Sequence, residues 1–227
     1  MSNVSCVHRF STIIAYCLCL VGPVLGQTAQ SSKVDAPNIK VGDSWTYDRI
    51  DGWKKSKEFT TVTVVISVDE KEIRTESKRT DTGAVTKRIH NKDLNPLVTE
   101  QRRGKDLSEP YYPRYAFPLE VGKTWEQKVI FTRTYETDRK VVATLKGTVL
   151  GWEQVTVPAG TFNALKIEVK GWYNGSNYRG TWSGRMADTI WYVPELKNAA
   201  KWIYQDTTGT QTFNHDIWEL VEYKPAQ

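Results

Sequence analysis

The chain has 227 residues, with 31 Lys and Arg against 26 Asp and Glu and 39% hydrophobic residues. This length predicts one large domain or two small ones and is enough to bury a core without disulfide cross-links. The net charge of +5 is too mild to indicate a nucleic-acid partner, which would require a concentrated basic stripe.

Residues 1–26 have the features of a secretory signal. Arg9 supplies the positive charge, and the apolar run of residues 13–25 is shorter than the roughly 18 residues of a membrane-spanning helix. We expect cleavage before Gln27, which leaves no transmembrane segment and predicts a periplasmic or secreted location. All the cysteines lie within the signal, so no disulfide or thiol chemistry is expected afterwards: Cys6, Cys17 and Cys19.

Residues 27–37 are small and polar and predict a flexible lead-in to a β domain over residues 38–225. In this domain apolar and polar residues alternate, which is the pattern of half-buried strands. The clearest predicted strands are residues 60–68, 141–150, 163–170, 188–193, 201–206 and 217–223. Short turns separate several of them, which predicts antiparallel neighbours and about ten or eleven strands in all.

Two copies of Val-Gly-x-Ser/Thr-Trp, at residues 41–45 and 121–125, each lead into a predicted strand. The second copy contains Gly-Lys-Thr, but Phe117 stands where a phosphate-binding loop needs its first glycine, so a nucleotide site is not expected. The copies instead predict two structural turns, each with a glycine at positive φ and a docked tryptophan. The residues concerned are Gly42, Trp45, Gly122 and Trp125.

This repeat indicates two related halves, residues 38–117 and 118–225. The stretch between the copies, residues 91–118, has four prolines and no clean period. It predicts a long functional loop or a crossover between the halves. Its aromatic residues are candidates for ligand binding, although packing over the sheet is the alternative: Tyr111, Tyr112 and Tyr115.

Four motifs occur in this order: VGDSWTY, FPLEVGKTW, VTVPAGTFNALKIE and TIWYVPELKNAAKW. The third predicts a further turn at Pro158 and Gly160. In these motifs the chain resembles a family of exported bacterial β-rich proteins of unknown function, over residues 37–223. The resemblance implies an all-β fold similar to lipoprotein carriers and lipocalin-like proteins, and it implies no reaction and no catalytic residues. We therefore predict a single antiparallel, strongly curved sheet or partly open barrel built from two related halves.

Residues for catalysis or metal binding are sparse. Beyond the signal only His90 and His215 remain, and a group of His215 with Asp206 and Asp216 across the last hairpin is the single candidate metal site considered. Residues 180–184 contain a serine between glycines but lack the spacing of a nucleophile elbow. We predict no catalytic residues, no metal and no cofactor.

Aromatic residues are the unusual feature, with nine tryptophans in the chain. Rings flanked by glycines and amides between residues 171 and 184 would suit sugar stacking or cover an apolar cavity: Trp172, Tyr173, Tyr178 and Trp182. We predict an exported, non-enzymatic envelope protein that binds an apolar or amphipathic ligand, such as a lipid, or a protein partner. The alternatives are a module that binds carbohydrate or cell-wall polymer, and a hydrolase of unknown type.

Overall fold

The computed structural model describes Met1, residues 33–209 and residues 211–227. The predicted signal, its cysteines, its cleavage site and residues 27–32 of the predicted lead-in lie outside the described residues, apart from Met1. Among the described residues the only helical segment is a single 3₁₀ turn, η1 (Pro194–Leu196), and no helix there is long and apolar enough to cross a membrane.

The described residues form fourteen strands, more than the ten or eleven predicted. The strands are β1 (Lys33–Val34), β2 (Ser44–Asp51), β3 (Lys57–Val68), β4 (Glu72–Arg79), β5 (Val85–Asn91), β6 (Pro96–Gln101), β7 (Gly104–Glu109), β8 (Leu119–Glu120), β9 (Thr124–Arg133), β10 (Glu136–Val157), β11 (Gly160–Asn177), β12 (Gly180–Val193), β13 (Asn198–Thr208) and β14 (Gln211–Lys224).

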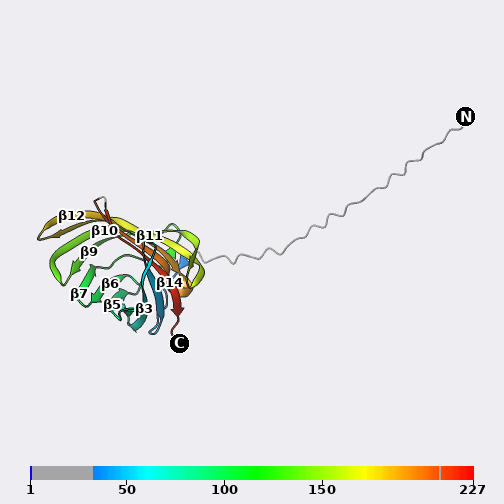
Figure 1. The fold of residues 1–227 in the computed structure, drawn as a ribbon, viewed down its shortest axis with the longest axis horizontal. Helices are drawn as coiled ribbons and strands as arrows, with labels where there is room; N and C mark the ends of the chain where they lie inside the picture. Colours follow the sequence, from blue (N-terminus) through cyan, green and yellow to red (C-terminus); the bar gives the residue numbers. More distant parts are fainter. Residues whose placement is uncertain (2–32, 210) are drawn as a thin grey trace. The chain divides into compact units, whose positions relative to one another are not determined.

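Twelve of these strands close into an antiparallel barrel (Figure 1). Each strand pairs with the next one in the chain, from β2 to β7 and from β9 to β14, and the pairs β7–β9 and β14–β2 complete the ring. The all-β prediction is confirmed, and within the predicted choice between a curved sheet and a partly open barrel the sheet closes fully. A closed barrel leaves no unpaired edge among these twelve strands.

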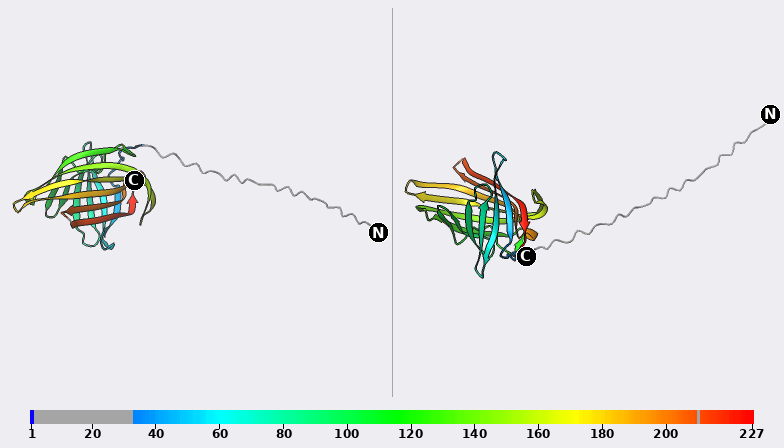
Figure 2. Two further views of the ribbon diagram at one scale, coloured as in Figure 1. Left: turned by 90° about the horizontal axis from the view of Figure 1, so that it is seen from above. Right: turned by 60° about the horizontal axis from the view of Figure 1, so that its bottom comes forward.

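The two predicted halves contribute six barrel strands each, and their lengths differ. Strands β2–β7 have 6 to 12 residues, whereas β9–β14 have 10 to 22. In Figure 2 the short strands run across the long ones, and the long strands extend beyond them at one side. The halves therefore form two walls of different size around one interior.

The two Val-Gly-x-Ser/Thr-Trp turns have the same backbone geometry. Gly42 and Gly122 have φ values of +96° and +86°, and their amides donate to the carbonyl oxygens of Val65 and Val149 over 2.9 Å each. Each of these acceptors lies on the second strand of its half. A repeated structural turn would have this shared geometry. The two turns differ in the side chain that follows the glycine, which is Asp43 in the first and Lys123 in the second.

Residues 33 and 34 differ from the prediction of a flexible lead-in. Lys33 and Val34 pair with Glu120 and Leu119 as a separate two-stranded sheet. Val34 packs against the core beside the fully buried Leu119. Burial of these aliphatic side chains orders a segment that its polar composition alone would leave flexible.

Residues 91–118 also differ from the prediction of a long loop. They contain the hairpin β6–β7, which joins β5 to β9 across the junction of the halves. Outside these strands lie two short turns, residues 92–95 and 102–103, and the longer segment 110–118. The hairpin escaped prediction because its strands are short and both faces mix polar with apolar residues.

The core lies mainly along the inner face of the long strands. Leu165, Ile167 and Val169 of β11 are almost fully buried, as their alternation with lysine and glutamate predicted. On β3 the side chains do not follow the expectation that the more apolar face of a strand is buried. Thr61 faces the interior, whereas Ile66 on the aliphatic face is 46% exposed. The short strands therefore turn hydroxyl-bearing side chains inward.

Candidate functional site

A cavity of about 520 Å³ occupies the interior between the two walls. Its lining runs from Ala84, which is exposed, to Asp188, which is 1% exposed, so the cavity reaches from the surface into the centre of the barrel. Ligand sites in proteins typically have volumes of about 300–1,000 Å³ and combine apolar walls with a few polar groups. This interior has both properties.

One wall of the cavity is polar because of strand periodicity. Thr75 and Ser77 of β4 and Thr86 and Arg88 of β5 all point inward, since they occupy alternate positions and are paired across the two strands. Outward positions of the same strands carry charges, and Lys87 forms an ion pair with Glu76 of the neighbouring strand at 3.9 Å. The inner face thus presents hydrogen-bonding groups to the lumen.

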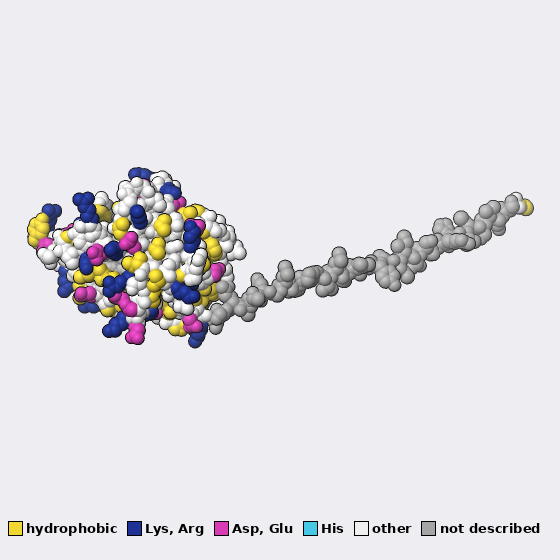
Figure 3. Space-filling view, turned by 90° about the horizontal axis from the view of Figure 1, so that it is seen from below, with side chains coloured by type: hydrophobic (Ala, Val, Ile, Leu, Met, Phe, Trp, Pro, Cys, Tyr) yellow, Lys and Arg dark blue, Asp and Glu magenta, His cyan; other side chains and the backbone are white. Residues whose placement is uncertain are grey.

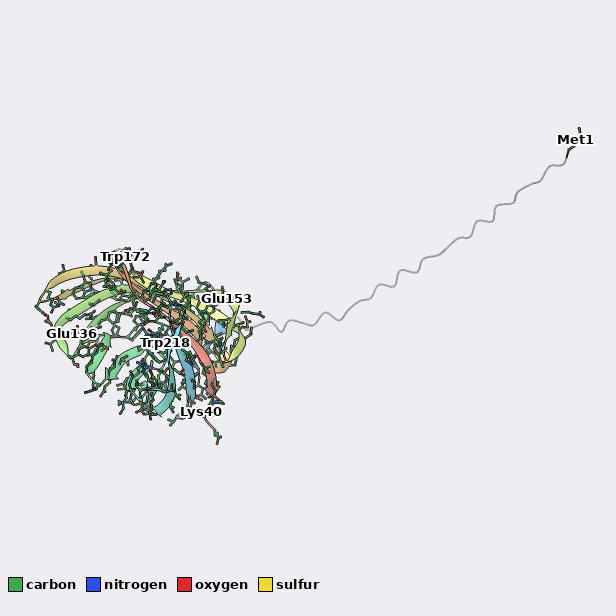
Figure 4. All side chains as sticks on the ribbon, viewed as in Figure 1. Met1, Lys40, Glu136, Glu153, Trp172 and Trp218 are labelled. Atoms are coloured by element: carbon green, nitrogen blue, oxygen red, sulfur yellow. The ribbon has the colours of Figure 1, made fainter. Side chains whose placement is uncertain are left out.

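The adjoining part of the lining, formed by β13, β14 and β2, is aromatic and apolar. Trp202 of β13 and Trp218 of β14 stack with centroids 5.2 Å apart, and Tyr47 of β2 meets Trp202 edge-on at 4.9 Å. The Tyr47 hydroxyl donates to the carbonyl oxygen of Ala199 over 2.6 Å, which fixes its ring. Figure 4 shows Trp218 near the centre of the molecule. These rings form a rigid surface suited to apolar contact.

The segment 110–118 enters the cavity and is held in place by backbone contacts. The Asn95 side chain accepts a hydrogen bond from the Tyr115 amide and donates to the Tyr115 carbonyl oxygen, both over 2.8 Å. The indole of Trp125 donates to the carbonyl oxygen of Pro113 over 2.9 Å. Through these contacts the second Val-Gly-x-Thr-Trp turn positions the segment that carries Tyr112 and Arg114.

Arg88 and His90 lie side by side along the inner face of β5. Arg88 donates to the Ser77 hydroxyl over 2.9 Å and has no ion pair among the described residues. Burial, together with the nearby charge of Arg114, lowers the pKa of Arg88 to about 10. Its charge is nevertheless retained at neutral pH, so the lumen holds a cation without a partner.

His90 is uncharged and fully engaged within the protein. Burial, with the charges of Arg88 and Arg114, lowers the pKa of His90 to about 3. Its Nδ1 lies 3.3 Å from the carbonyl oxygen of Leu94, which can only accept, so Nδ1 carries the proton. Its Nε2 then accepts from the Thr75 hydroxyl at 3.3 Å.

Four buried polar atoms in the cavity lack hydrogen-bond partners among the described residues. They belong to Asp188 (both carboxylate oxygens), Arg114 (Nε) and Tyr112 (hydroxyl). The closest approach between the charged groups is 3.8 Å, from Arg114 Nε to Asp188 Oδ2, which is beyond hydrogen-bond distance. Burial raises the pKa of Asp188. Because buried polar groups in folded proteins are nearly always paired with protein groups, ordered water or a ligand, this cluster is a candidate site.

Two other arginines that line the cavity have close carboxylate partners. Arg49 contacts both Glu58 and Asp216, the latter at 2.6 Å. Arg79 lies over the Phe59 ring at 3.8 Å and pairs with Asp81 at 2.6 Å. Arg88 differs from these arginines in having no carboxylate partner, and Arg114 differs in having only the long contact to Asp188.

The structure divides the candidate residues of the 91–118 stretch. Tyr112 and Tyr115 line the cavity, and Tyr111 does not. Tyr115 contacts Phe117 and Tyr192 with centroids 5.5 and 5.4 Å away, so it belongs to the packed core as well as to the lumen. Whether these residues bind a ligand stays a prediction.

The four aromatic candidates of residues 171–184 do not share one face. Tyr173 is 4% exposed, and its hydroxyl bonds to Asp206 and Thr208, while Trp182 lies on the same face across the strand pair β11–β12. Trp172 is 66% exposed on the other face, at the periphery of the molecule in Figure 4. Tyr178 is 75% exposed in the turn. A flat platform of four rings is therefore absent.

The remaining predicted residues serve turns or lie apart. Pro158 and Gly160 form the tight turn between β10 and β11, where Gly160 has a φ of +136°. His215 meets the Trp53 ring edge-on at 5.6 Å, and its neighbour Asp216 points into the cavity. Since adjacent strand residues face opposite ways, these two do not converge with Asp206 on a common site.

Sequence reasoning missed the deepest residues of the cavity, which are Arg88, His90 and Asp188 as well as Arg114. A signal was present in β5, where Thr86, Arg88 and His90 occupy alternate positions and must share a face. This pattern alone does not indicate an interior face, because charged residues normally point to solvent.

Figure 3 shows basic, acidic and hydrophobic side chains interspersed on one surface of the molecule, without a continuous basic stripe on that face.

No protein-family model and no curated protein matches the chain, so the sequence resemblance stays a prediction. Three solved structures are similar. A candidate lipoprotein from Parabacteroides distasonis has 15% identity and a TM-score of 0.48, covering 86% of this chain and 100% of its own. The hypothetical lipoprotein YmcC from Escherichia coli has 12% identity and a TM-score of 0.45, covering 82% of this chain and 86% of its own.

The third is a candidate exported protein with a YmcC-like fold from Bacteroides fragilis. It has 15% identity and a TM-score of 0.51, and the match covers 85% of this chain and 99% of that one. At this identity the likeness concerns the fold. The barrel of this chain has the fold of that Bacteroides fragilis protein.

Proposed function

We propose that this protein is an exported, non-enzymatic envelope protein, periplasmic or secreted, which binds a small apolar or amphipathic ligand inside its barrel. The observation that carries the proposal is the cavity of about 520 Å³, whose lining combines stacked tryptophans with buried polar atoms that lack hydrogen bonds. A barrel interior that served only stability would be filled with side chains.

The physical basis of binding is burial of apolar ligand surface against Tyr47, Trp202 and Trp218. Such burial contributes about 25 cal/mol per Å² before the costs of association. The rings are fixed by stacking and by the Tyr47 hydrogen bond, so little conformational freedom would be lost on binding. A rigid apolar wall favours affinity for this reason.

The non-enzymatic part of the proposal has a specific support in His90. Both ring nitrogens of this histidine are hydrogen-bonded within the protein, and its pKa of about 3 leaves it a poor proton acceptor at neutral pH. A general base would need a free nitrogen within reach of a substrate and a pKa near the working pH.

The proposal can be tested with the neutral fluorescent probe N-phenyl-1-naphthylamine and two matched variants of β5. Thr86 lines the cavity, and the adjacent Lys87 lies on the outer face. Thr86→Trp would fill the lumen, whereas Lys87→Trp adds the same ring outside. We expect saturable binding to the wild-type protein and to Lys87→Trp, with loss of at least ten-fold in affinity for Thr86→Trp.

Both variants must first show wild-type circular dichroism and cooperative unfolding. Absence of saturable binding to the wild-type protein, or equal binding to both variants, would overturn the lumen as the ligand site. If probe binding instead responded to changes at Trp172 and Tyr178, the exposed aromatic residues of the β11–β12 hairpin would be favoured, as the carbohydrate-binding alternative requires.

A further inference from the structure

The deep part of the cavity has an excess of positive charge that the protein itself does not compensate. Arg88 has no carboxylate partner among the described residues, and Arg114 approaches only Asp188, at 3.8 Å. Arg49, which also lines the cavity, differs from them because its guanidinium contacts two carboxylates, those of Glu58 and Asp216. Two cations therefore face at most one carboxylate.

Such an arrangement is unfavourable in the absence of a ligand. Arg88 is half-buried and has no ion pair, and its single hydrogen bond to the Ser77 hydroxyl replaces only part of the solvation that it loses. Arg114 Nε, a hydrogen-bond donor, is buried and unpartnered. An oxygen-rich anion would supply the missing acceptors, and the planar guanidinium fork matches carboxylate and phosphate geometry.

The neighbouring unpartnered groups limit the ligand further. Neither oxygen of Asp188 nor the Tyr112 hydroxyl makes a hydrogen bond of normal geometry among the described residues, although the Tyr112 hydroxyl lies close enough to Asp188 to oppose the rise that burial causes in its pKa. A hydroxyl close to the anionic group could donate to Asp188. The aromatic wall begins directly beside the cations, because the Arg114 guanidinium lies 5.7 Å from the centroid of the Trp202 ring.

We propose that the lumen selects amphipathic anions, whose carboxylate or phosphate group is bound by Arg88 and Arg114 while the apolar part lies along Trp202 and Trp218. The inference rests on the proposed binding of ligands in the lumen and specifies their chemical class. The same head-group chemistry occurs in lipids and in free inorganic anions.

Four probes separate these sources: dodecanoate, dodecyl phosphate, dodecan-1-ol and inorganic phosphate, each measured by calorimetry below its micelle concentration. We expect both dodecyl anions to bind at least ten-fold more tightly than dodecan-1-ol. Weak or absent binding of inorganic phosphate would assign the site to amphipathic ligands. Binding of inorganic phosphate as tight as that of dodecyl phosphate would overturn the amphipathic part of the proposal.

Arg88→Met tests the role of the cation, and Arg74→Met is its control. Arg74 lies on the outer face of the neighbouring strand β4 and pairs with Glu72, so both variants remove one positive charge and only one removes it from the lumen. We expect Arg88→Met to lose the ten-fold preference for anions, to keep binding of N-phenyl-1-naphthylamine, and to unfold at a temperature equal to or above that of the wild-type protein. Arg74→Met should keep the preference.

A purely structural role for Arg88 would give a different result, in which Arg88→Met lowers the unfolding temperature and weakens neutral and anionic probes equally. If Arg88→Met does not fold, Arg88→Lys keeps the charge without the planar fork and should reduce the preference for dodecyl phosphate several-fold. Failure of the wild-type protein to bind the neutral probe would count against the proposed function. Equal binding of dodecan-1-ol and the anions, with the neutral probe bound, would overturn this inference alone.

Discussion

The two halves of the barrel begin with the same turn and use their inner faces differently. Strands β9–β14 present Leu145, Ile167 and Leu220 to the interior, all almost fully buried. Strands β2–β5 present Thr61, Thr75 and Arg88 and leave space between them. The long strands thus supply the packed core, and the short ones supply the polar wall of the cavity. A repeated strand plan allows one copy to maintain stability while the other is free to accept unfavourable side chains.

The turns themselves show the same divergence at one position. Asp43 follows the first glycine and accepts hydrogen bonds from the Lys40 and Ala226 amides and from Lys197. Burial would raise its pKa, but these contacts outweigh that effect and lower it. Lys123 occupies the equivalent position and donates to the carbonyl oxygens of Ala116 and Pro118. One turn therefore anchors the end of the chain, and the other anchors the segment that enters the cavity.

The largest expected difference between the halves is in core packing. Leu145→Ala, on the long strand β10, should lower the free energy of unfolding by about 2–5 kcal/mol because it opens a void in a fully buried site. Thr61→Ala, on the inner face of β3, should cost less than about 1 kcal/mol because its side chain already borders a cavity. Urea denaturation measures both, and similar losses would contradict the division into core and cavity walls.

The next difference concerns the two turns. Asp43→Asn should reduce stability by about 3 kcal/mol, because the buried carboxylate accepts several donors that a neutral amide cannot satisfy together. Lys123→Ala should cost about 1 kcal/mol or less, since its ammonium group is partly exposed. Unfolding curves of the two variants, recorded side by side, decide whether only the first turn has gained a buried charged anchor.

Acidification should destabilise the polar wall before the core. The pKa of His90 falls from 6.5 to about 3 on folding, so the unfolded chain binds a proton below pH 6.5 that the folded protein excludes. The stability contributed by neutral His90 is therefore present above pH 6.5 and decreases by up to about 1.4 kcal/mol per pH unit as the pH falls towards 3. The urea midpoint of the wild-type protein should fall as the pH is lowered from about 7 to about 5. In this window most carboxylates stay charged, because their reference pKa values are about 4. The urea midpoint of His90→Gln should not fall in this way over the same window. An equal fall in both proteins would refute the assignment of His90 as a side chain that stays neutral in the folded protein.

The smallest expected effect tests the equivalence of the two glycines. An added Cβ at Gly122 would meet nothing within 4 Å, and at Gly42 it would make an ordinary contact of 3.5 Å with Ala226. Substitution by alanine should therefore cost only the backbone term of a positive φ, about 1 kcal/mol at each position. Thermal unfolding of Gly42→Ala and Gly122→Ala should show nearly equal shifts, and a large inequality would indicate that the turns are not equivalent.

The fold was largely predictable because alternation and turn chemistry are local. The strands around Leu165 and Ile167 follow directly from an apolar residue at every second position. The repeated glycine turns predicted a boundary between two halves, and each turn precedes six of the barrel strands. The closure of the barrel was less accessible, since it depends on pairing between β2 and β14 at opposite ends of the domain.

The candidate site was mostly beyond prediction for a physical reason. Alternation shows which residues share a face, but the side that faces the interior depends on the whole barrel. On β3 the valines suggested one buried face, and Thr61 on the other face lines the cavity. Arg114 and Asp188 come from a segment outside the strands and from β12, and their proximity depends on tertiary packing that no local pattern records.

Closure by β14 has a consequence for how this protein is made. The first and last barrel strands both line the lumen and pair with each other. Residues 44–51 of β2 pair antiparallel with residues 216–224 of β14. During synthesis the barrel cannot close until β14 has emerged, because a sheet that lacks this strand has two unpaired edges. Unpaired strand edges can pair with other chains. The hydrogen bonds between β14 and β2 that close the barrel therefore also protect the newly made protein from aggregation.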